Sequence, residues 1–161
     1  MSTPHLEIRT PPGEATISFQ RFVAAPPALV FACMTQCEHL GQWWGPAYLE
    51  LTECEIDLRV GGRYRFVSSA PDGTEHPFHG EYLEIDAPHR LVSTFVYEPW
   101  PDASAVDTVE LTAKDGGTLM AGTSVFGSVE TRDRHVESGM EGGMRESYER
   151  LDRLVETLHA G

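Results

Sequence analysis

Ionisable side chains inside strand-like segments are the first candidates for chemistry in this 161-residue chain. His79 and Glu84 stand in an alternating segment, where Glu84 shares parity with the rings of Phe78 and Tyr82. Because side chains alternate between the two faces of a strand, Glu84 is expected to point inward if those rings do. A buried histidine or carboxylate could move protons, since burial shifts its pKa. The alternatives are a solvated outer face for His79 and a strand-end ion pair for Glu84.

Large rings and methionines form a second group, which could bind a ligand by shape and apolar contact. The candidate ligand-binding residues are Trp43, Trp44, Tyr64, Phe66, Phe78, Tyr82, Phe95, Met140 and Met144. Methionine adapts to irregular surfaces, and tyrosine or tryptophan adds a polar group that orients a ligand. For each residue alone, an ordinary place in the hydrophobic core is the alternative.

Motifs for metal binding and nucleophilic catalysis have little support. Cys33 and Cys37 are one helical turn apart and His39 follows, but the paired spacing of a zinc site is absent. The sequence has no Gly-x-Ser-x-Gly elbow, phosphate loop or dinucleotide fingerprint. We therefore expect no metal and no cofactor. The three cysteines are expected to be small buried hydrophobic side chains rather than a disulfide framework.

The charge balance excludes several partners. The chain has 25 Asp and Glu against 12 Lys and Arg, a formal net charge of −13. Such a chain repels phosphate backbones and anionic lipids, so we expect neither nucleic acid nor a membrane as partner. No apolar run is long enough to span a bilayer, and the N-terminus has no secretory pattern. Together with the sparse cysteines, this predicts a cytoplasmic protein.

Turn signals and periodicity divide the chain into an arm and one domain. Residues 1–14, which are rich in proline, are expected to be a flexible N-terminal arm, and 15–161 a single domain. The expected elements are a strand at 15–24, helices after Pro27 and at 39–44, strands at 48–60, 63–69, 78–86, 91–97, 106–113 and 118–126, and a helix from about 132 to the C-terminus.

Two irregularities are expected within these elements. The apolar residues of 48–60 change from odd to even positions, which predicts a bulge or bend near Thr52-Glu53. Gly139, Gly142 and Gly143 lie close together in the last helix, and each lowers helix propensity by about 1 kcal/mol relative to alanine. They predict a kink, or a place where the backbone approaches something closely.

The expected elements must pack as an α+β domain. An antiparallel sheet with one apolar face needs a cover, and the apolar stripe from Met140 to Leu158 makes the last helix that cover. A curved sheet and a single helix cannot meet everywhere, so a cavity is expected between them.

Five segments carry a resemblance to a known family. They are Arg21–Pro26 with Val30-Phe31, Trp43–Pro46, Gly61–Phe66, Gly80–Ile85 with Pro88–Leu91, and Gly139–Met144 with Leu151–Leu154. In this order, over roughly residues 15–158, they resemble the activator of heat-shock-protein-90 ATPase homologue family. That family belongs to the SRPBCC, START and birch-pollen-allergen-like superfamily and is also described as polyketide-cyclase-like. The resemblance implies a helix-grip fold, with six to seven strands wrapped around a long C-terminal helix and two short helices after strand one.

The resemblance leaves three functions open, because the superfamily includes lipid carriers, hormone receptors, cyclases, dehydratases and co-chaperone domains. The leading one is binding of a small hydrophobic or aromatic ligand between the sheet and the C-terminal helix. The alternatives are a cyclase or dehydratase that uses a cavity histidine or carboxylate, and a module that binds a chaperone or regulator. An enzyme should place a titratable group with a shifted pKa inside the cavity, and a module should expose an apolar patch. Homodimer formation stays open.

Overall fold

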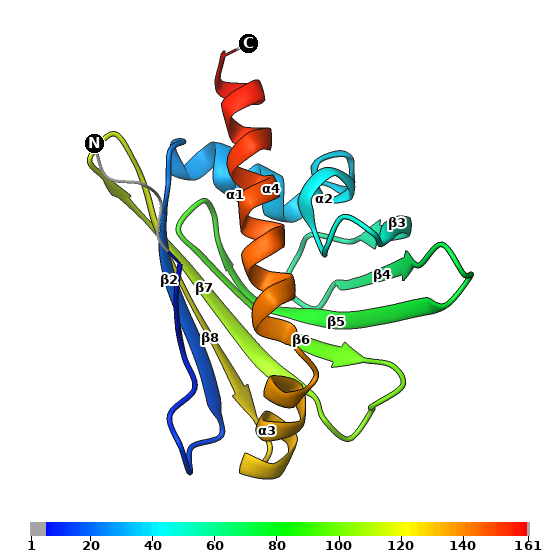
Figure 1. Ribbon diagram of the computed structural model, residues 1–161. Helices are drawn as coiled ribbons and strands as arrows, with labels where there is room; N and C mark the ends of the chain where they lie inside the picture. Colours follow the sequence, from blue (N-terminus) through cyan, green and yellow to red (C-terminus); the bar gives the residue numbers. More distant parts are fainter. Residues whose placement is uncertain (1–5, 161) are drawn as a thin grey trace.

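One antiparallel sheet of eight strands organises the molecule, a computed structural model that describes residues 6–160 (Figure 1). The strands are β1 Glu7–Arg9, β2 Thr16–Val23, β3 Glu50–Ile56, β4 Arg63–Ser69, β5 Glu75–Asp86, β6 Arg90–Tyr97, β7 Ala105–Lys114 and β8 Gly117–Phe126. Their order across the sheet is β1-β2-β8-β7-β6-β5-β4-β3. The expected antiparallel sheet is confirmed, with one strand more than predicted.

The additional strand is β1, in the segment expected to be a flexible arm. Glu7 lies opposite Gln20 and Arg9 opposite Ser18 in the β1–β2 pairing, and Leu6 is buried in the core. The prediction was therefore wrong for residues 7–9. Such a short strand has no periodicity of its own and is held by the backbone hydrogen bonds of β2. Residues 1–5 of the expected arm lie outside the described residues.

Two short helices follow β2, as expected. They are α1 Pro27–Thr35 and α2 Cys37–Trp43. Proline starts α1 because its fixed backbone angle suits the first helical turn and the missing N–H would have no partner there. None of the helices in the described part of the chain is long and apolar enough to cross a membrane.

The C-terminal part forms two helices where one kinked helix was predicted. They are α3 Val129–Glu137 and α4 Met140–Ala160. The hydroxyl of Ser128 accepts a hydrogen bond from the backbone N–H of Thr131 and caps α3. Gly139 separates the helices with a φ of +87°, a left-handed conformation that glycine adopts at little cost. The predicted irregularity is confirmed at Gly139.

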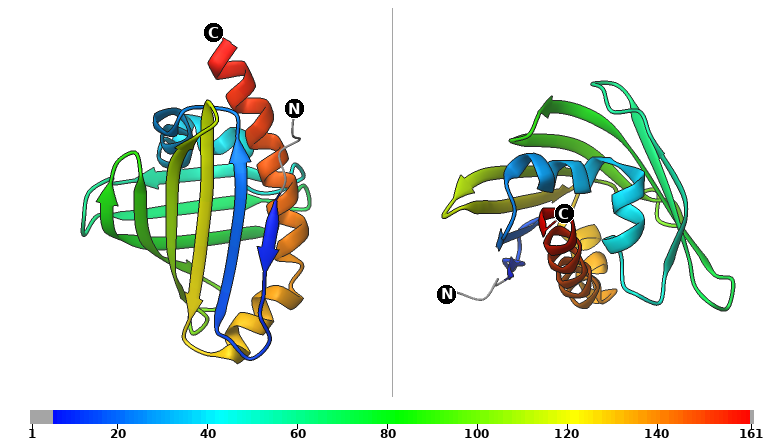
Figure 2. Two further views of the ribbon diagram at one scale, coloured as in Figure 1. Left: turned by 90° about the vertical axis from the view of Figure 1, so that its left-hand side faces the viewer. Right: turned by 90° about the horizontal axis from the view of Figure 1, so that it is seen from above.

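The sheet curves around α4, as the view from above shows (Figure 2, right). The apolar face of α4 enters the core through Leu151 and Val155, which are almost completely buried. Two bulges interrupt the strand pairing: one between Leu51 and Glu53, as predicted, and one between Tyr82 and Glu84, which was not predicted. Bulges bend a strand and increase its twist, so they help the sheet to curve.

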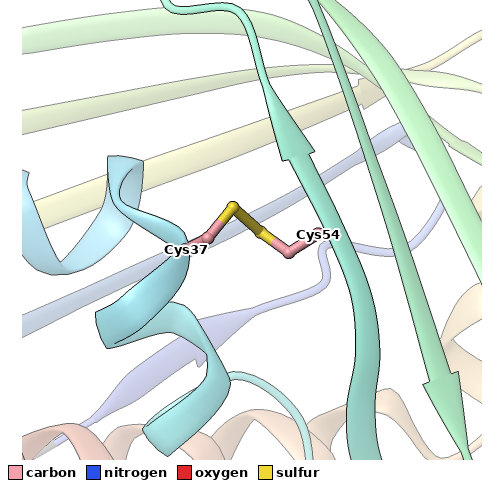
Figure 3. Close-up of a disulfide and its surroundings, with 2 residues drawn as sticks. All are labelled: Cys37 and Cys54. Atoms are coloured by element: carbon pink, nitrogen blue, oxygen red, sulfur yellow. A yellow bond between two sulfur atoms is a disulfide. The ribbon is translucent and has the colours of Figure 1, made fainter.

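A disulfide joins Cys37 at the start of α2 to Cys54 on β3 (Figure 3). The expectation of small buried cysteines without a disulfide is therefore wrong for this pair, because only the fold brings the two residues together. It is correct for Cys33, where burial raises the pKa of the thiol to about 11. The disulfide also removes the cysteine count as an argument for a reducing compartment.

Reduction of the Cys37–Cys54 disulfide is expected to lower the free energy of unfolding by about 2–3 kcal/mol. The bond spans 17 residues of sequence, and opening it gives the unfolded chain more conformations. Urea unfolding with and without reductant measures the difference. The Cys37→Ser/Cys54→Ser variant is the control, since it should be insensitive to reductant. An unchanged wild-type midpoint in reductant would contradict the prediction.

Candidate ligand cavity

A cavity of about 430 Å³ lies on the concave face of the sheet. Strands β2 and β4 to β8 provide its floor and walls, α4 covers it from one side, and α2 with the following loop closes another. An adjoining space between α4, the loop after α2 and the loop after β6 shares Pro46, Leu49 and Met140 with this cavity. We call this adjoining space the mouth.

All nine residues predicted to bind a ligand line this cavity. They are Trp43, Trp44, Tyr64, Phe66, Phe78, Tyr82, Phe95, Met140 and Met144. Four of the rings are at most 7% exposed, those of Trp43, Tyr64, Phe66 and Tyr82. The alternation of apolar residues on the strands and the helical spacing of the methionines direct both groups to the same space.

The two neighbouring tryptophans differ in what they contact. The indole N–H of Trp43 donates to the backbone carbonyl of Cys33 at 2.9 Å, and its ring stacks on Tyr148. Trp44 instead meets Phe66 and Phe78 edge to face, with ring centres 5.2 and 5.0 Å apart. Both rings line the cavity, but Trp43 is fixed to the core by this hydrogen bond, whereas Trp44 contacts other aromatic rings of the lining.

A polar group lies in the middle of this apolar lining. Asp107 on β7 stands opposite Ser93 of β6 and Ser124 of β8, so three adjacent strands bring these side chains together. All three line the cavity. The hydroxyl of Ser124 donates to Oδ1 of Asp107 at 2.6 Å.

The environment of Asp107 shifts its titration toward neutral pH. Burial raises the pKa of its carboxyl to about 6, although the hydrogen bond from Ser124 acts in the opposite direction. The side chain of Asp107 is partly exposed, and it forms part of the cavity lining. A group that titrates near neutral pH inside a cavity can hold or release a proton there.

Three tyrosines surround the same space and stay neutral. Burial and the nearby charge of Asp107 raise the pKa of Tyr64, whose hydroxyl donates to the carbonyl of Thr94 at 2.6 Å. Burial also raises the pKa of Tyr82, to about 12, and that of Tyr148. These hydroxyls can therefore serve as hydrogen-bond groups but carry no charge at neutral pH.

His135 of α3 lies where the cavity meets the mouth. Its Nε2 donates to the carbonyl of Ala103 at 3.1 Å, and its ring contacts Trp100 and Phe126. Burial lowers the pKa of this imidazole, so the neutral form is favoured. No group of three or more side chains suited to a metal ion occurs in the described part of the chain.

The two predicted proton-transfer residues lie outside the cavity. His79 is exposed on the outer face of the sheet and contacts Glu98 at 3.0 Å. Glu84 is exposed and forms an ion pair with Arg90 at 3.2 Å. The inward position expected for Glu84 was wrong because the bulge after Tyr82 adds one residue and reverses the parity of the strand.

Asp107 is the cavity residue that the sequence reasoning missed, although the strand carries a signal for it. It shares parity with Ala105, Val109 and Leu111, and all three point into the molecule. A charged residue that alternates in step with the apolar residues of a strand indicates a polar group on the inner face. Ser93 and Ser124 follow the same rule on their strands.

Comparison with known proteins gives a consistent result. The model of the family "Activator of Hsp90 ATPase homolog 1-like protein" matches residues 24–156. A crystal structure from Rhodobacter sphaeroides is similar, with a TM-score of 0.87, 28% identity, and coverage of 95% of this chain and 99% of that one. Proteins from Nitrosomonas europaea (TM-score 0.82, 27% identity, 91% and 97% coverage) and Arthrobacter aurescens (0.83, 28%, 94% and 91%) are also similar.

A search of curated proteins found no match to this sequence. The structural neighbours share the helix-grip arrangement of a curved antiparallel sheet and a long C-terminal helix. The family model extends from the end of β2 to the last turns of α4 and thus includes most of the cavity lining. The chain therefore belongs to the family of activator of Hsp90 ATPase homolog 1-like proteins.

Proposed function

We propose that this protein binds a small hydrophobic or aromatic molecule in the cavity between the sheet and α4. The observation that carries the proposal is the combination of about 430 Å³ of space with a lining of aromatic and methionine side chains. This volume lies within the range of about 300–1,000 Å³ that is typical of small-molecule sites. An apolar ligand would remove this surface from water, and each Å² of apolar surface removed contributes about 25 cal/mol.

The mouth supports the proposal because it offers a way into the cavity. Gly143 lines both the cavity and the mouth, and a Cβ atom added to it would meet no other atom within 4 Å. The neighbouring Gly142 lines the mouth and is equally unobstructed. The first atom of a larger side chain at Gly143 would therefore lie in open space.

Gly143→Phe is expected to weaken binding of the neutral dye N-phenylnaphthylamine about tenfold or more, because the new ring occupies the entrance. The substitution should not destabilise the helix, since glycine has a lower helix propensity than phenylalanine by about 0.3–0.5 kcal/mol. Dye fluorescence titrations measure the affinity, and thermal unfolding measures the stability.

Gly41→Phe is the matched control for this experiment. Gly41 lies on α2, is exposed, lines neither the cavity nor the mouth, and would also accept a Cβ without contact. Equal affinities for Gly143→Phe and Gly41→Phe would contradict binding inside the cavity. Native mass spectrometry of the purified protein, followed by denaturing extraction, would identify a ligand that remains bound.

Asp107 supports a second candidate function, an enzyme of the cyclase or dehydratase kind. A carboxylate whose pKa is raised to about 6 inside an apolar cavity could take the proton next to a carbonyl group. The Asp107 carboxyl would then return this proton to a β-hydroxyl, which would leave as water while the carbon–carbon double bond forms. The probe for this function is 4-hydroxy-4-phenylbutan-2-one. If the protein is such an enzyme, the wild type should convert this probe to the conjugated enone, and Asp107→Asn should not.

A further inference from the structure

The charge of the cavity has one sign. Among the described residues, the lining contains one carboxylate, Asp107, and no lysine or arginine. The mouth adds Glu146 and again neither lysine nor arginine. The formal net charge of −13 on the whole chain also favours cations over anions, and the buried Arg21, which lies over the ring of Tyr148, is paired with Asp152.

The carboxylate of Asp107 has room for a ligand. Ser124 hydrogen-bonds to Oδ1, and this is the one hydrogen bond that the described part of the chain donates to the group. The side chain is partly exposed and lines the cavity, and its second oxygen, Oδ2, has no hydrogen-bond donor in the described part of the chain. A carboxylate accepts hydrogen bonds at both oxygens, so a donor on a ligand would complete its coordination.

The other titratable groups around the cavity stay neutral near pH 7. Burial raises the pKa of Tyr64, Tyr82 and Tyr148 and lowers that of His135, which faces the cavity from α3. Asp107 is therefore the lining group that changes charge in this range. When Asp107 loses its proton, a negative charge lies among aromatic rings. A cation there would be attracted both by the carboxylate and by the faces of the rings.

We propose that the cavity selects apolar molecules that carry a protonated amino group, with the ammonium donating to Oδ2 of Asp107 and the rings enclosing the apolar body. This inference rests on the proposed function and names its ligand class. An amine partner would neutralise the buried carboxylate, whereas a ligand carboxylate would place two like charges together without a cation. Neutral alcohols would donate one uncharged hydrogen bond and fall between the two.

Three probes of similar size test the selection: naphthylethylamine, naphthylethanol and naphthylacetate. Calorimetric titration at about pH 8 should give the amine a Kd about tenfold or more below that of the acid. Asp107→Asn, which is similar in shape, should raise the Kd of the amine about tenfold or more and that of the alcohol by less than about threefold. In the wild type, amine affinity should fall as the pH drops below about 6, and alcohol affinity should not.

The outcomes separate this inference from the proposed function. If the alcohol binds but amine and acid bind equally, or if Asp107→Asn keeps the preference for the amine, the selection of amines is overturned and the proposed function stands. If none of the three probes binds, the proposed function fails and the inference fails with it. The pH dependence of the wild type provides evidence that requires no variant.

Discussion

Replacement of Asp152 by alanine is expected to lower the free energy of unfolding by about 3 kcal/mol. Arg21 on β2 is only 4% exposed, and its Nη2 donates to Oδ2 of Asp152 on α4 at 2.6 Å. The guanidinium also lies over the ring of Tyr148, 5.4 Å from its centre. Without Asp152, a buried positive charge would lose its carboxylate partner, and this is costly in an apolar interior.

The expected loss comes from the charge that is left behind rather than from the intrinsic strength of the pair. In the described part of the chain, Nε of Arg21 and Oδ1 of Asp152 have no hydrogen-bond partners. Burial raises the pKa of the Asp152 carboxyl in spite of the neighbouring guanidinium. An incompletely satisfied pair of this kind can be exchanged for apolar residues at little cost.

Two controls distinguish these contributions in urea unfolding. The Arg21→Met/Asp152→Leu variant should unfold within about 1 kcal/mol of the wild type. Asp57→Ala, which removes the partner of the exposed Arg59, should change the stability by less than about 1 kcal/mol. A loss below about 1 kcal/mol for Asp152→Ala would show that the buried arginine does not depend on its partner.

Asp107→Asn is expected to increase the free energy of unfolding by up to about 3 kcal/mol at pH 8. Folding raises the pKa of this carboxyl from its ordinary 3.8 to about 6, so the folded state holds its proton more tightly than the unfolded state does. The contribution of the Asp107 carboxyl to the free energy of unfolding is therefore fully present below about pH 4 and is lost as the pH rises through about 6. Asparagine carries no charge and avoids this loss.

Urea unfolding at several pH values checks the sign as well as the magnitude. The stabilisation by Asp107→Asn should be large at about pH 8 and small at about pH 4. Tyr64, Tyr82 and Tyr148 remain protonated in this range, so they should not obscure the comparison. Equal effects at both pH values would show that the charge of Asp107 is not the cause. A residue that lowers stability where it is ionised fits a role in binding or chemistry rather than in folding.

The strands and their inward residues were largely predictable, because alternation depends on local sequence. Strand β4 has the predicted limits, 63–69, and the change of parity in β3 predicted the bulge between Leu51 and Glu53. Strand β5 contains the same signal, which the prediction did not use: its apolar residues change from even positions, ending at Tyr82, to odd positions at Leu83 and Ile85. Glu84 was consequently assigned to the wrong face.

Contacts between distant segments could not be predicted in this way. The disulfide requires α2 and β3 to lie side by side, and β1 requires the free edge of β2. The raised pKa of Asp107 depends on how completely neighbouring strands and α4 enclose it. The aromatic residues around the cavity were predictable as a group, because many rings at inward positions must meet in one apolar region. The pattern is the same whether that region is a packed core or a cavity.

The bulge in β5 also determines how many carboxylates the cavity contains. Without the bulge, Leu83 would pair with Val92 and Glu84 with Leu91, which lines the cavity, so Glu84 would point inward. Two carboxylates in one apolar space cannot both ionise readily and would share a proton. The pairing register of one strand, and not only its residue types, thus keeps Asp107 as the single acidic group lining this cavity within the described residues.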